Sequence, residues 1–171
     1  MLVWIVFTFV VIQRLLELML AKRNEQWMKK EGAVEYGHSH YMYMVLMHIS
    51  FFVSLIIEVI FTNKSANQYW AILLIIFVVI QLARVWVILS LGKYWNTKII
   101  VLPGSNIVSK GPFQFIKHPN YLIVTIELII LPLMFQAYFT MLVFFFLNQI
   151  ILAIRIPIEE QALQENTDYK K

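Results

Sequence analysis

The chain contains no cysteine among its 171 residues. This absence excludes a disulfide framework, a cysteine-ligated metal site and a thiol nucleophile. Charged side chains are also scarce: they make up 14% of the chain, whereas hydrophobic residues make up 60%. This balance, together with several uninterrupted apolar runs, predicts an integral membrane protein rather than a soluble domain.

Glycine occurs only five times, and no glycine fingerprint follows an expected strand. A Rossmann-type cofactor site is therefore excluded. The sequence has no basic stripe interleaved with aromatic residues, so nucleic acid is not an expected partner. The N-terminus lacks the basic segment and small-residue cleavage site of a signal peptide, and we therefore expect residues 2–21 to remain as a first membrane span.

Apolar runs of spanning length cover residues 2–21, 42–61 and 69–91. A fourth run, residues 121–154, is interrupted at Pro132 and Gln136. Its helical length is about 51 Å, whereas two crossings of the hydrocarbon core need about 60 Å and a turn. We therefore expect two short helices that form a hairpin with both ends on one side, and the length leaves open whether the hairpin crosses the bilayer fully.

The predicted fold is an all-α integral membrane protein. It has three transmembrane helices followed by the helical hairpin, about five membrane helices in all, and a short C-terminal cytoplasmic helix. No linker, repeat or low-complexity segment divides the chain, so residues 1–171 are expected to form a single transmembrane domain.

Basic residues are distributed unequally between the segments that flank the spans. Eleven of them lie before the second run, before the hairpin or in the tail: Lys22, Arg23, Lys29, Lys30, Lys93, Lys98, Lys110, Lys117, Arg155, Lys170 and Lys171. The loop between the second and third runs carries only Lys64. The positive-inside rule therefore predicts an external N-terminus and a cytoplasmic C-terminus.

The polar stretch at residues 110–121 precedes the hairpin. Gly111 and the proline after it form a turn signal, and Pro119 suits the first position of a helix. Lys117 and His118 should therefore lie at the start of that helix, where free N–H groups and a partial positive charge favour a carboxylate or an enolate. The alternative is an interfacial cap in which these residues only anchor the membrane boundary.

A second polar group follows the hairpin. Arg155 is separated from Glu159 and Glu160 by Pro157, which should break the helix near the membrane boundary and open the short terminal helix. Because the hairpin folds back, these carboxylates should return to the side of His118 and form one cytoplasmic pocket suited to a zwitterion. The alternative is that they are favourable acids in a first helical turn and that Arg155 is an interfacial anchor.

The order of these features resembles the isoprenylcysteine carboxyl methyltransferase family of membrane enzymes. The shared order is Gly-Pro-aromatic, Lys-His-Pro-x-Tyr, an apolar hairpin and Arg-x-x-x-Glu-Glu-x-x-Leu, over about residues 93–163. The family usually has arginine where Lys117 stands and glycine where Ile123 stands. Its trailing Phe-Gly and paired tyrosines are reduced here to Asn166, Thr167 and Tyr169.

The resemblance implies a methyltransferase that uses S-adenosylmethionine. The implied cofactor-binding residues are Ser105, Asn106, Ile107, Val108, Phe113, His118, Tyr121, Glu159 and Glu160. Arg155 would face an acidic oxygen of the acceptor, and Lys117 would orient the acceptor. His118 has an alternative role as a general base. The chemistry agrees, because a sulfonium and its amino group attract carboxylates, whereas the carboxylate of the donor attracts a cation or a helix N-terminus.

The N-terminal half resembles a bacterial branch of the family that includes enzymes methylating alkylpyrones. This resemblance rests on Gln13-Arg14-Leu-Leu-Glu17, Ala21-Lys-Arg-Asn24-Glu25, Gly32-Ala33 and His40-Tyr41. Arg14 and Glu17 lie three residues apart, and Gln81 and Arg84 repeat that spacing, so we expect an interhelical network, with substrate contact as the alternative. Glu58 and Glu127 also need partners, and Glu127 should face either the cofactor or a neighbouring helix.

Glu35, His38 and His40 contain possible metal ligands, but they lack a fourth well-spaced ligand, and we expect no metal site. The predicted function is O-methylation of a lipophilic acidic acceptor, a carboxylate or an enol hydroxyl, at the cytoplasmic side of a bacterial inner membrane. The expected partners are this acceptor and the bilayer, without an obligate protein partner. The alternatives are a prenylated cysteine carboxylate or a phospholipid amine as acceptor, and a non-enzymatic transporter or scaffold, which is disfavoured because the sequence shows no paired repeats with broken helices.

Overall fold

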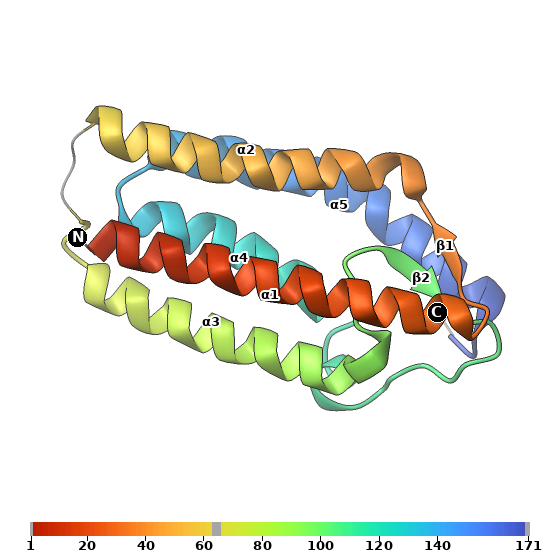
Figure 1. Cartoon of the computed structure of the whole chain (residues 1–171). Coiled ribbons are helices and arrows are strands. Elements are labelled where there is room, and N and C mark those ends of the chain that lie inside the picture. The colour runs from red at the N-terminus through yellow and green to blue at the C-terminus, as the bar shows by residue number, and fades with distance from the viewer. Residues whose placement is uncertain (1, 63–65, 170–171) are drawn as a thin grey trace. The chain divides into compact units, whose positions relative to one another are not determined.

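The structure, a computed structural model, describes residues 2–62 and 66–169. Its elements in chain order are α1 (Leu2–Lys30), β1 (Val34–Tyr36), α2 (His38–Thr62), α3 (Trp70–Leu91), the 3-10 helix η1 (Gly92–Tyr94), β2 (Ile99–Val101), the 3-10 helix η2 (Gly111–Gln114), α4 (Pro119–Met134) and α5 (Tyr138–Asn166) (Figure 1). Within the described residues, four helices, α1, α2, α3 and α5, are long and apolar enough to cross a membrane, and α4 is a shorter apolar helix. The predicted all-α membrane class is confirmed. Lys64, Lys170 and Lys171 of the charge count lie outside the described residues.

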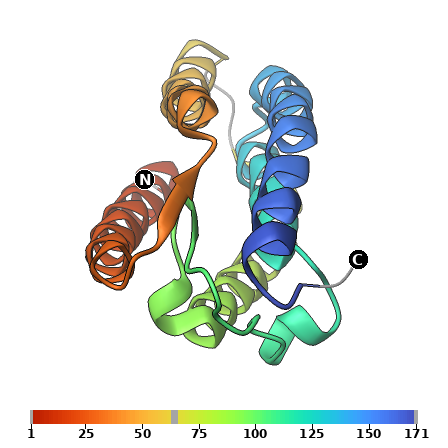
Figure 2. The ribbon, with the colours of Figure 1, turned by 90° about the vertical axis from the view of Figure 1, so that its right-hand side faces the viewer.

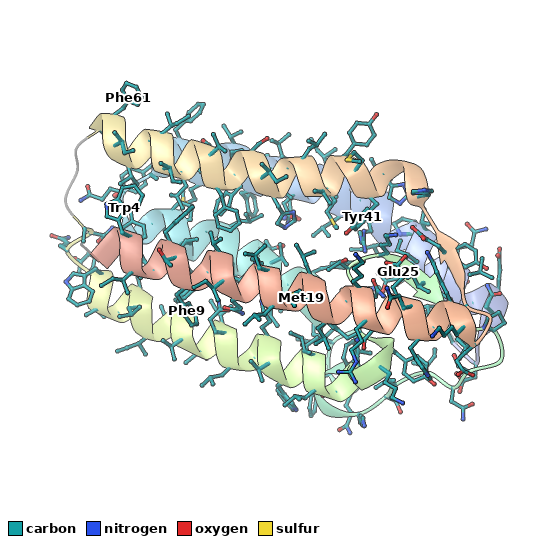
Figure 3. The ribbon with its side chains drawn as sticks, viewed as in Figure 1. Trp4, Phe9, Met19, Glu25, Tyr41 and Phe61 are labelled. Carbon is teal, nitrogen blue, oxygen red and sulfur yellow. The ribbon has the colours of Figure 1, made fainter. Side chains whose placement is uncertain are left out.

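Large apolar side chains cover the outside of the long helices, as a lipid-facing surface requires. Met19 on α1 is 69% exposed and Phe61 on α2 is 83% exposed (Figure 3). In a water-soluble protein such a dense apolar surface would lead to aggregation. In a bilayer it is the surface that the hydrocarbon chains cover, so the chain is a multi-pass membrane protein.

Helix α1 continues to Lys30, well beyond its apolar run. Its polar end consists of good helix formers, and Lys29 Nζ donates to Glu25 Oε1 at 2.5 Å, four residues earlier. The basic residues of its last turn also complement the negative end of the helix dipole. Helix α1 is therefore longer than its apolar run, and its last turns are polar.

The predicted hairpin is present as α4 and α5. Helix α4 begins at Pro119, as predicted, and Gln136 turns the chain between the helices with a positive φ of 56°. Asn148 Nδ2 on α5 donates to Thr125 Oγ1 on α4 at 2.9 Å, so the two helices pack against each other.

The predicted helix break at Pro157 is wrong. Helix α5 runs without interruption from Tyr138 to Asn166, so the second helix of the hairpin is long and the expected short C-terminal helix is its final part. A proline removes one backbone N–H and disfavours the helical conformation of the residue before it, but it does not forbid that conformation. Packing holds the turns beyond Pro157 helical: Ala162 is buried against Ile99 and Val101 of β2.

The chain divides into two compact units, which are described separately. Unit 1 comprises the described residues of Met1–His38, Leu91–Val108 and Arg155–Lys171. Unit 2 comprises the described residues of Ser39–Ser90 and Ser109–Ile154.

Unit 1 contains a short antiparallel ribbon that the sequence patterns did not predict. Strands β1 and β2 lie side by side (Figure 2). They pair with Val34 opposite Val101 and Tyr36 opposite Ile99. All of β2 is buried, and Ile158 and Leu163 of α5 pack on the cluster around it. The ribbon therefore ties the polar end of α1 to the last turns of α5.

Unit 2 contains α2, α3, α4 and the first part of α5, and polar side chains join its helices. Gln81 Nε2 on α3 donates to Glu127 Oε1 on α4 at 2.7 Å, and Arg84 forms an ion pair with Glu127. The expected interhelical network is thus present at these positions. Glu58 on α2 accepts the backbone N–H groups of Phe139 and Thr140 at 3.0 and 2.7 Å, which places a carboxylate at the N-terminus of α5.

In unit 1, the charged pair of α1 lies within a single helix. Arg14 Nη1 donates to Glu17 Oε2 at 2.6 Å, and Gln13 Nε2 donates to Glu17 Oε1 at 3.0 Å. Glu17 itself is buried. Burying a charged side chain in a membrane span costs free energy unless the charge is paired, and Arg14 and Gln13 provide this pairing for Glu17.

Candidate functional site

The predicted site residues fall into two groups, one in each unit. Lys117, His118 and Tyr121 lie around the start of α4 in unit 2, together with Phe113 of η2. The remaining predicted residues lie in unit 1: Ser105, Asn106, Ile107, Val108, Arg155, Glu159 and Glu160.

In unit 2 the approach to α4 is fixed by Gly111, which precedes Pro112 at the start of η2. Gly111 has a φ of +63°, a conformation that glycine adopts without strain. A Cβ atom at this position would lie 2.2 Å from Ser90 Oγ and 3.2 Å from Trp86 Nε1. The loop before α4 therefore approaches the end of α3 so closely that a larger residue at this position would force Ser90 to shift.

The start of α4 carries an aromatic pair. His118 is the N-cap residue, Pro119 is the first helical residue, and Tyr121 follows at a spacing of three. The rings of His118 and Tyr121 stack with centres 5.4 Å apart and an angle of 21° between their planes. Lys117 is exposed beside them. A flat aromatic surface, a cation and the N-terminus of a helix thus occur together at one place.

Asn120 is a residue of this region that the sequence motifs did not predict. It lies between Pro119 and Tyr121 in the first turn of α4. Its Oδ1 atom is buried and has no hydrogen-bond partner among the described residues. A buried polar atom without a partner costs free energy, so this amide is a candidate contact for a polar ligand. In the sequence, only its position inside the Lys-His-Pro-x-Tyr motif indicates that Asn120 could belong to the site.

In unit 1 the predicted strip at residues 105–108 lies along the C-terminal turns of α5. Gly104 N donates to Asn166 O at 2.8 Å, and Ile107 N donates to Asp168 Oδ1 at 2.8 Å. Ser105 Oγ closes the turn by donating to Leu102 O at 2.7 Å. The structure therefore brings this strip to the helix that carries Glu159 and Glu160.

Arg155 is 5% exposed, and its Nη2 donates to Thr97 O at 2.5 Å. Glu159 follows four residues later, so the guanidinium and this carboxylate share one face of α5. Glu160 accepts a hydrogen bond from the Tyr169 hydroxyl at 3.4 Å. Burial raises the pKa of the Tyr169 hydroxyl, and the negative charge of Glu160 adds to the shift.

The possible metal ligand Glu35 belongs to an ionic cluster in unit 1. Its carboxylate lies 2.9 Å from Lys29 Nζ and 3.3 Å from Lys98 Nζ, and Lys98 Nζ also lies 2.9 Å from Glu25. Burial opposes ionisation of Glu35, but the hydrogen bonds from Lys29 and Lys98 outweigh it and lower the pKa of that carboxyl. The hydrogen bond to Glu25 is the main cause of the raised pKa of Lys98. The cluster joins α1, β1 and the loop before β2.

Comparison with known proteins agrees with the motif order. A sequence model of the isoprenylcysteine carboxyl methyltransferase family matches residues 71–165, more than half of the chain. The chain is 46% identical over 162 residues to the uncharacterised protein YpbQ of Bacillus subtilis, covering 95% of this chain and 96% of that protein. It is 34% identical over 160 residues to an uncharacterised protein of Haemophilus influenzae, covering 93% of each. No solved structure matches the chain.

The family match extends from α3 to the last turns of α5 and includes the start of α4 as well as Arg155, Glu159 and Glu160. The long apolar helices are those of a multi-pass membrane protein. Together these findings identify the chain as a member of the isoprenylcysteine carboxyl methyltransferase family of membrane methyltransferases.

Proposed function

We propose that the protein is an S-adenosylmethionine-dependent O-methyltransferase acting on a lipophilic acidic acceptor. The acceptor oxygen would belong to a carboxylate or to an enol hydroxyl such as that of an alkylpyrone. Membership of the methyltransferase family is the observation that carries the proposal. The bacterial-branch motifs in the N-terminal half support the choice of acceptor class.

When bound, S-adenosylmethionine supplies an electrophilic methyl group to an acceptor oxygen. From the family resemblance, we assign its binding to Glu159 and Glu160 of unit 1, with residues 105–108 as lining, and to His118 and Tyr121 of unit 2, with Phe113 as lining. The residue types fit such a group: carboxylates attract its cationic amino group, and the start of α4 attracts its carboxylate. The buried Oδ1 of Asn120, which has no partner among the described residues, supports a polar ligand at the start of α4.

Arg155 and Lys117 are assigned to the acceptor. A guanidinium forms a planar fork that matches a carboxylate or an enolate, and the hydrogen bond from Arg155 to Thr97 O fixes the orientation of that fork. An ionised acceptor needs no base, so positioning and exclusion of water should supply the rate enhancement. His118 would then hold the donor, and it would accept a proton only from an acceptor that arrives protonated.

We also propose that the protein lies in the bacterial inner membrane with its active site in the cytoplasm. The unequal distribution of lysine and arginine between the loops supports this orientation. A reporter fused after Lys171 should therefore give a cytoplasmic signal. An external signal would overturn the orientation and the cytoplasmic entry of the donor.

The test of the proposed function is a comparison of acceptors. Purified protein receives labelled S-adenosylmethionine with a long-chain acid, an acidic alkylpyrone, a prenylcysteine acid or phosphatidylethanolamine. We expect the acidic lipids to be methylated, and we expect Arg155→Lys to lower turnover while donor affinity stays unchanged, because lysine keeps the charge but loses the fork. O-methylation would be refuted if phosphatidylethanolamine were methylated preferentially and if Arg155→Lys did not change the rate of that reaction. Exclusive use of the prenylcysteine acid would instead identify the alternative acceptor of the family.

A further inference from the structure

Basic and aromatic side chains gather in unit 1 where α1 leaves its apolar run. Lys93 Nζ lies 5.0 Å from the centre of the Trp27 ring, and the rings of Trp27 and Tyr94 meet edge to face with centres 5.9 Å apart. Arg23, Trp27 and Lys30 follow one another at spacings of four and three residues, so they share one face of α1. We refer to Arg23, Trp27, Lys30, Lys93 and Tyr94 as the basic-aromatic cluster.

The two segments that form the cluster are fixed to each other by Asn24. This buried side chain donates to Gly92 O at 3.1 Å and to Trp95 O at 2.8 Å, on either side of Lys93 and Tyr94. A buried amide with two backbone acceptors is costly to displace. The backbone segment that carries Lys93 and Tyr94 is therefore fixed against α1.

The part of the cluster nearest the apolar run of α1 falls at the depth of lipid headgroups. Along the axis of α1, Arg23 is about 3 Å and Trp27 about 9 Å beyond Ala21, the last residue of the apolar run. The headgroup layer extends roughly 5 to 8 Å beyond the hydrocarbon core on each side, so Arg23 lies within this layer and Trp27 lies at its outer edge. Tryptophan and tyrosine favour this layer, because their rings are apolar and their N–H or O–H groups remain hydrated.

The charge of the cluster is positive. Arg23, Lys30 and Lys93 are all exposed. The neighbouring carboxylate of Glu25 is engaged by Lys29 at 2.5 Å and by Lys98 at 2.9 Å, and Glu31 follows one residue after the end of α1. The three cations outnumber the single carboxylate of Glu31, so the cluster favours an anion such as a phosphate. The planar guanidinium of Arg23 and the compact ammonium of Lys93 are both suitable donors to phosphate oxygens.

We propose that the basic-aromatic cluster binds the phosphodiester headgroup of an anionic glycerophospholipid. Arg23 and Lys93 contact the phosphate oxygens, Lys30 adds attraction at longer range, and the rings of Trp27 and Tyr94 lie beside the headgroup. This site does not depend on the proposed methyl transfer, so either proposal can fail without the other.

Lys22 provides a matched control for this site. It is exposed and has the same charge as its neighbour Arg23. At 100° per residue, however, it points about 140° away from Trp27 around the axis of α1. Lys22→Gln therefore removes the same charge at the same depth without touching the cluster.

The experiment is native mass spectrometry of the full chain in detergent, titrated with dioleoylphosphatidylglycerol. A basic side chain near an anionic surface contributes roughly a fivefold change in affinity, so Arg23→Gln and Lys93→Gln should each weaken binding about fivefold. Lys22→Gln should leave binding unchanged, and Lys93→Arg should retain it. Circular dichroism of every variant checks that the helices are intact.

Three results would overturn the proposal. An equal loss in Lys22→Gln would show diffuse attraction instead of a site, and equal binding of dioleoylphosphatidylcholine would show that the lipid charge is not recognised. Complete competition by glycerol phosphate would identify a soluble phosphate, rather than a lipid, as the ligand. If Lys93→Arg lost binding as completely as Lys93→Gln, the assignment of Lys93 as a phosphate contact would be wrong.

Discussion

Replacing Glu127 with alanine should destabilise the protein more than most single substitutions. Glu127 lies in α4 and pairs with Arg84 of α3; the side chains of Glu127 and Arg84 are 8% and 3% exposed. Arg84 Nε donates to Glu127 Oε1 at 3.1 Å, and Gln81 donates to the same oxygen at 2.7 Å. The substitution would therefore leave a buried guanidinium without this carboxylate and a partly buried amide without this acceptor.

The expected cost follows from this burial. Removing one partner of a buried ion pair typically costs about 3 to 5 kcal/mol, mostly because the remaining charge is uncompensated. In a chain of this size, each kcal/mol lost from the free energy of unfolding lowers the melting temperature by about 2 to 4 °C. Glu127→Ala should therefore lower the melting temperature by roughly 6 to 20 °C. Arg84→Met combined with Glu127→Leu should recover most of this loss, because it replaces both charges with apolar groups of similar size.

Thermal unfolding in detergent, followed by far-ultraviolet circular dichroism, measures this effect. Glu31→Ala, which removes an exposed carboxylate, is the control and should change the melting temperature little. The reasoning would be refuted if Glu127→Ala matched this control. It would also be refuted if the double variant were less stable than the single one, since the uncompensated charge would then not be the cause.

Three further substitutions test other parts of the account. Gly111→Ala should destabilise the protein more than Gly104→Ala in the same melting assay: both have positive φ, but only at Gly111 would the new Cβ meet Ser90, so equal losses would argue against the close approach. Glu159→Ala should weaken binding of S-adenosylmethionine roughly a hundredfold by calorimetry, the cost of a buried charged hydrogen bond, and unchanged affinity would remove this residue from the site. Glu35→Gln should make the free energy of unfolding depend less on pH in acid. Because the pKa of Glu35 is lowered in the folded protein, its carboxylate stabilises the fold at pH values above its ordinary pKa of 4.5, and this stabilisation is lost as the pH falls through the lower pKa of the folded state. An unchanged acid profile in Glu35→Gln would contradict that contribution.

The membrane helices could be predicted from the sequence because the bilayer leaves few alternatives. An apolar run must satisfy its backbone internally, so length and composition were enough for α2 and α3. The start of α4 was predictable for a local reason, since Pro119 has a fixed φ and lacks the N–H that a first helical residue does not use. These features depend on a few adjacent residues.

Features that depend on distant contacts could not be predicted in the same way. The persistence of α5 through Pro157 depends on packing against β2, and the β1–β2 ribbon joins strands separated by more than sixty residues. The spacing of Gln81 and Arg84 predicted an interhelical network, but it did not identify Glu127 as their partner. Likewise, the buried oxygen of Asn120 and the approach of Gly111 to Ser90 are visible only in three dimensions.

The most direct test of the central claim is to incubate the purified protein with S-adenosylmethionine labelled in its methyl group and a bacterial lipid extract, and to identify the labelled product by mass spectrometry. We expect a methyl group on the oxygen of a lipophilic acid or enol, and loss of that product in Glu159→Ala. Label found only on the nitrogen of a phospholipid would contradict it, as would the absence of any labelled lipid from a protein that binds the donor.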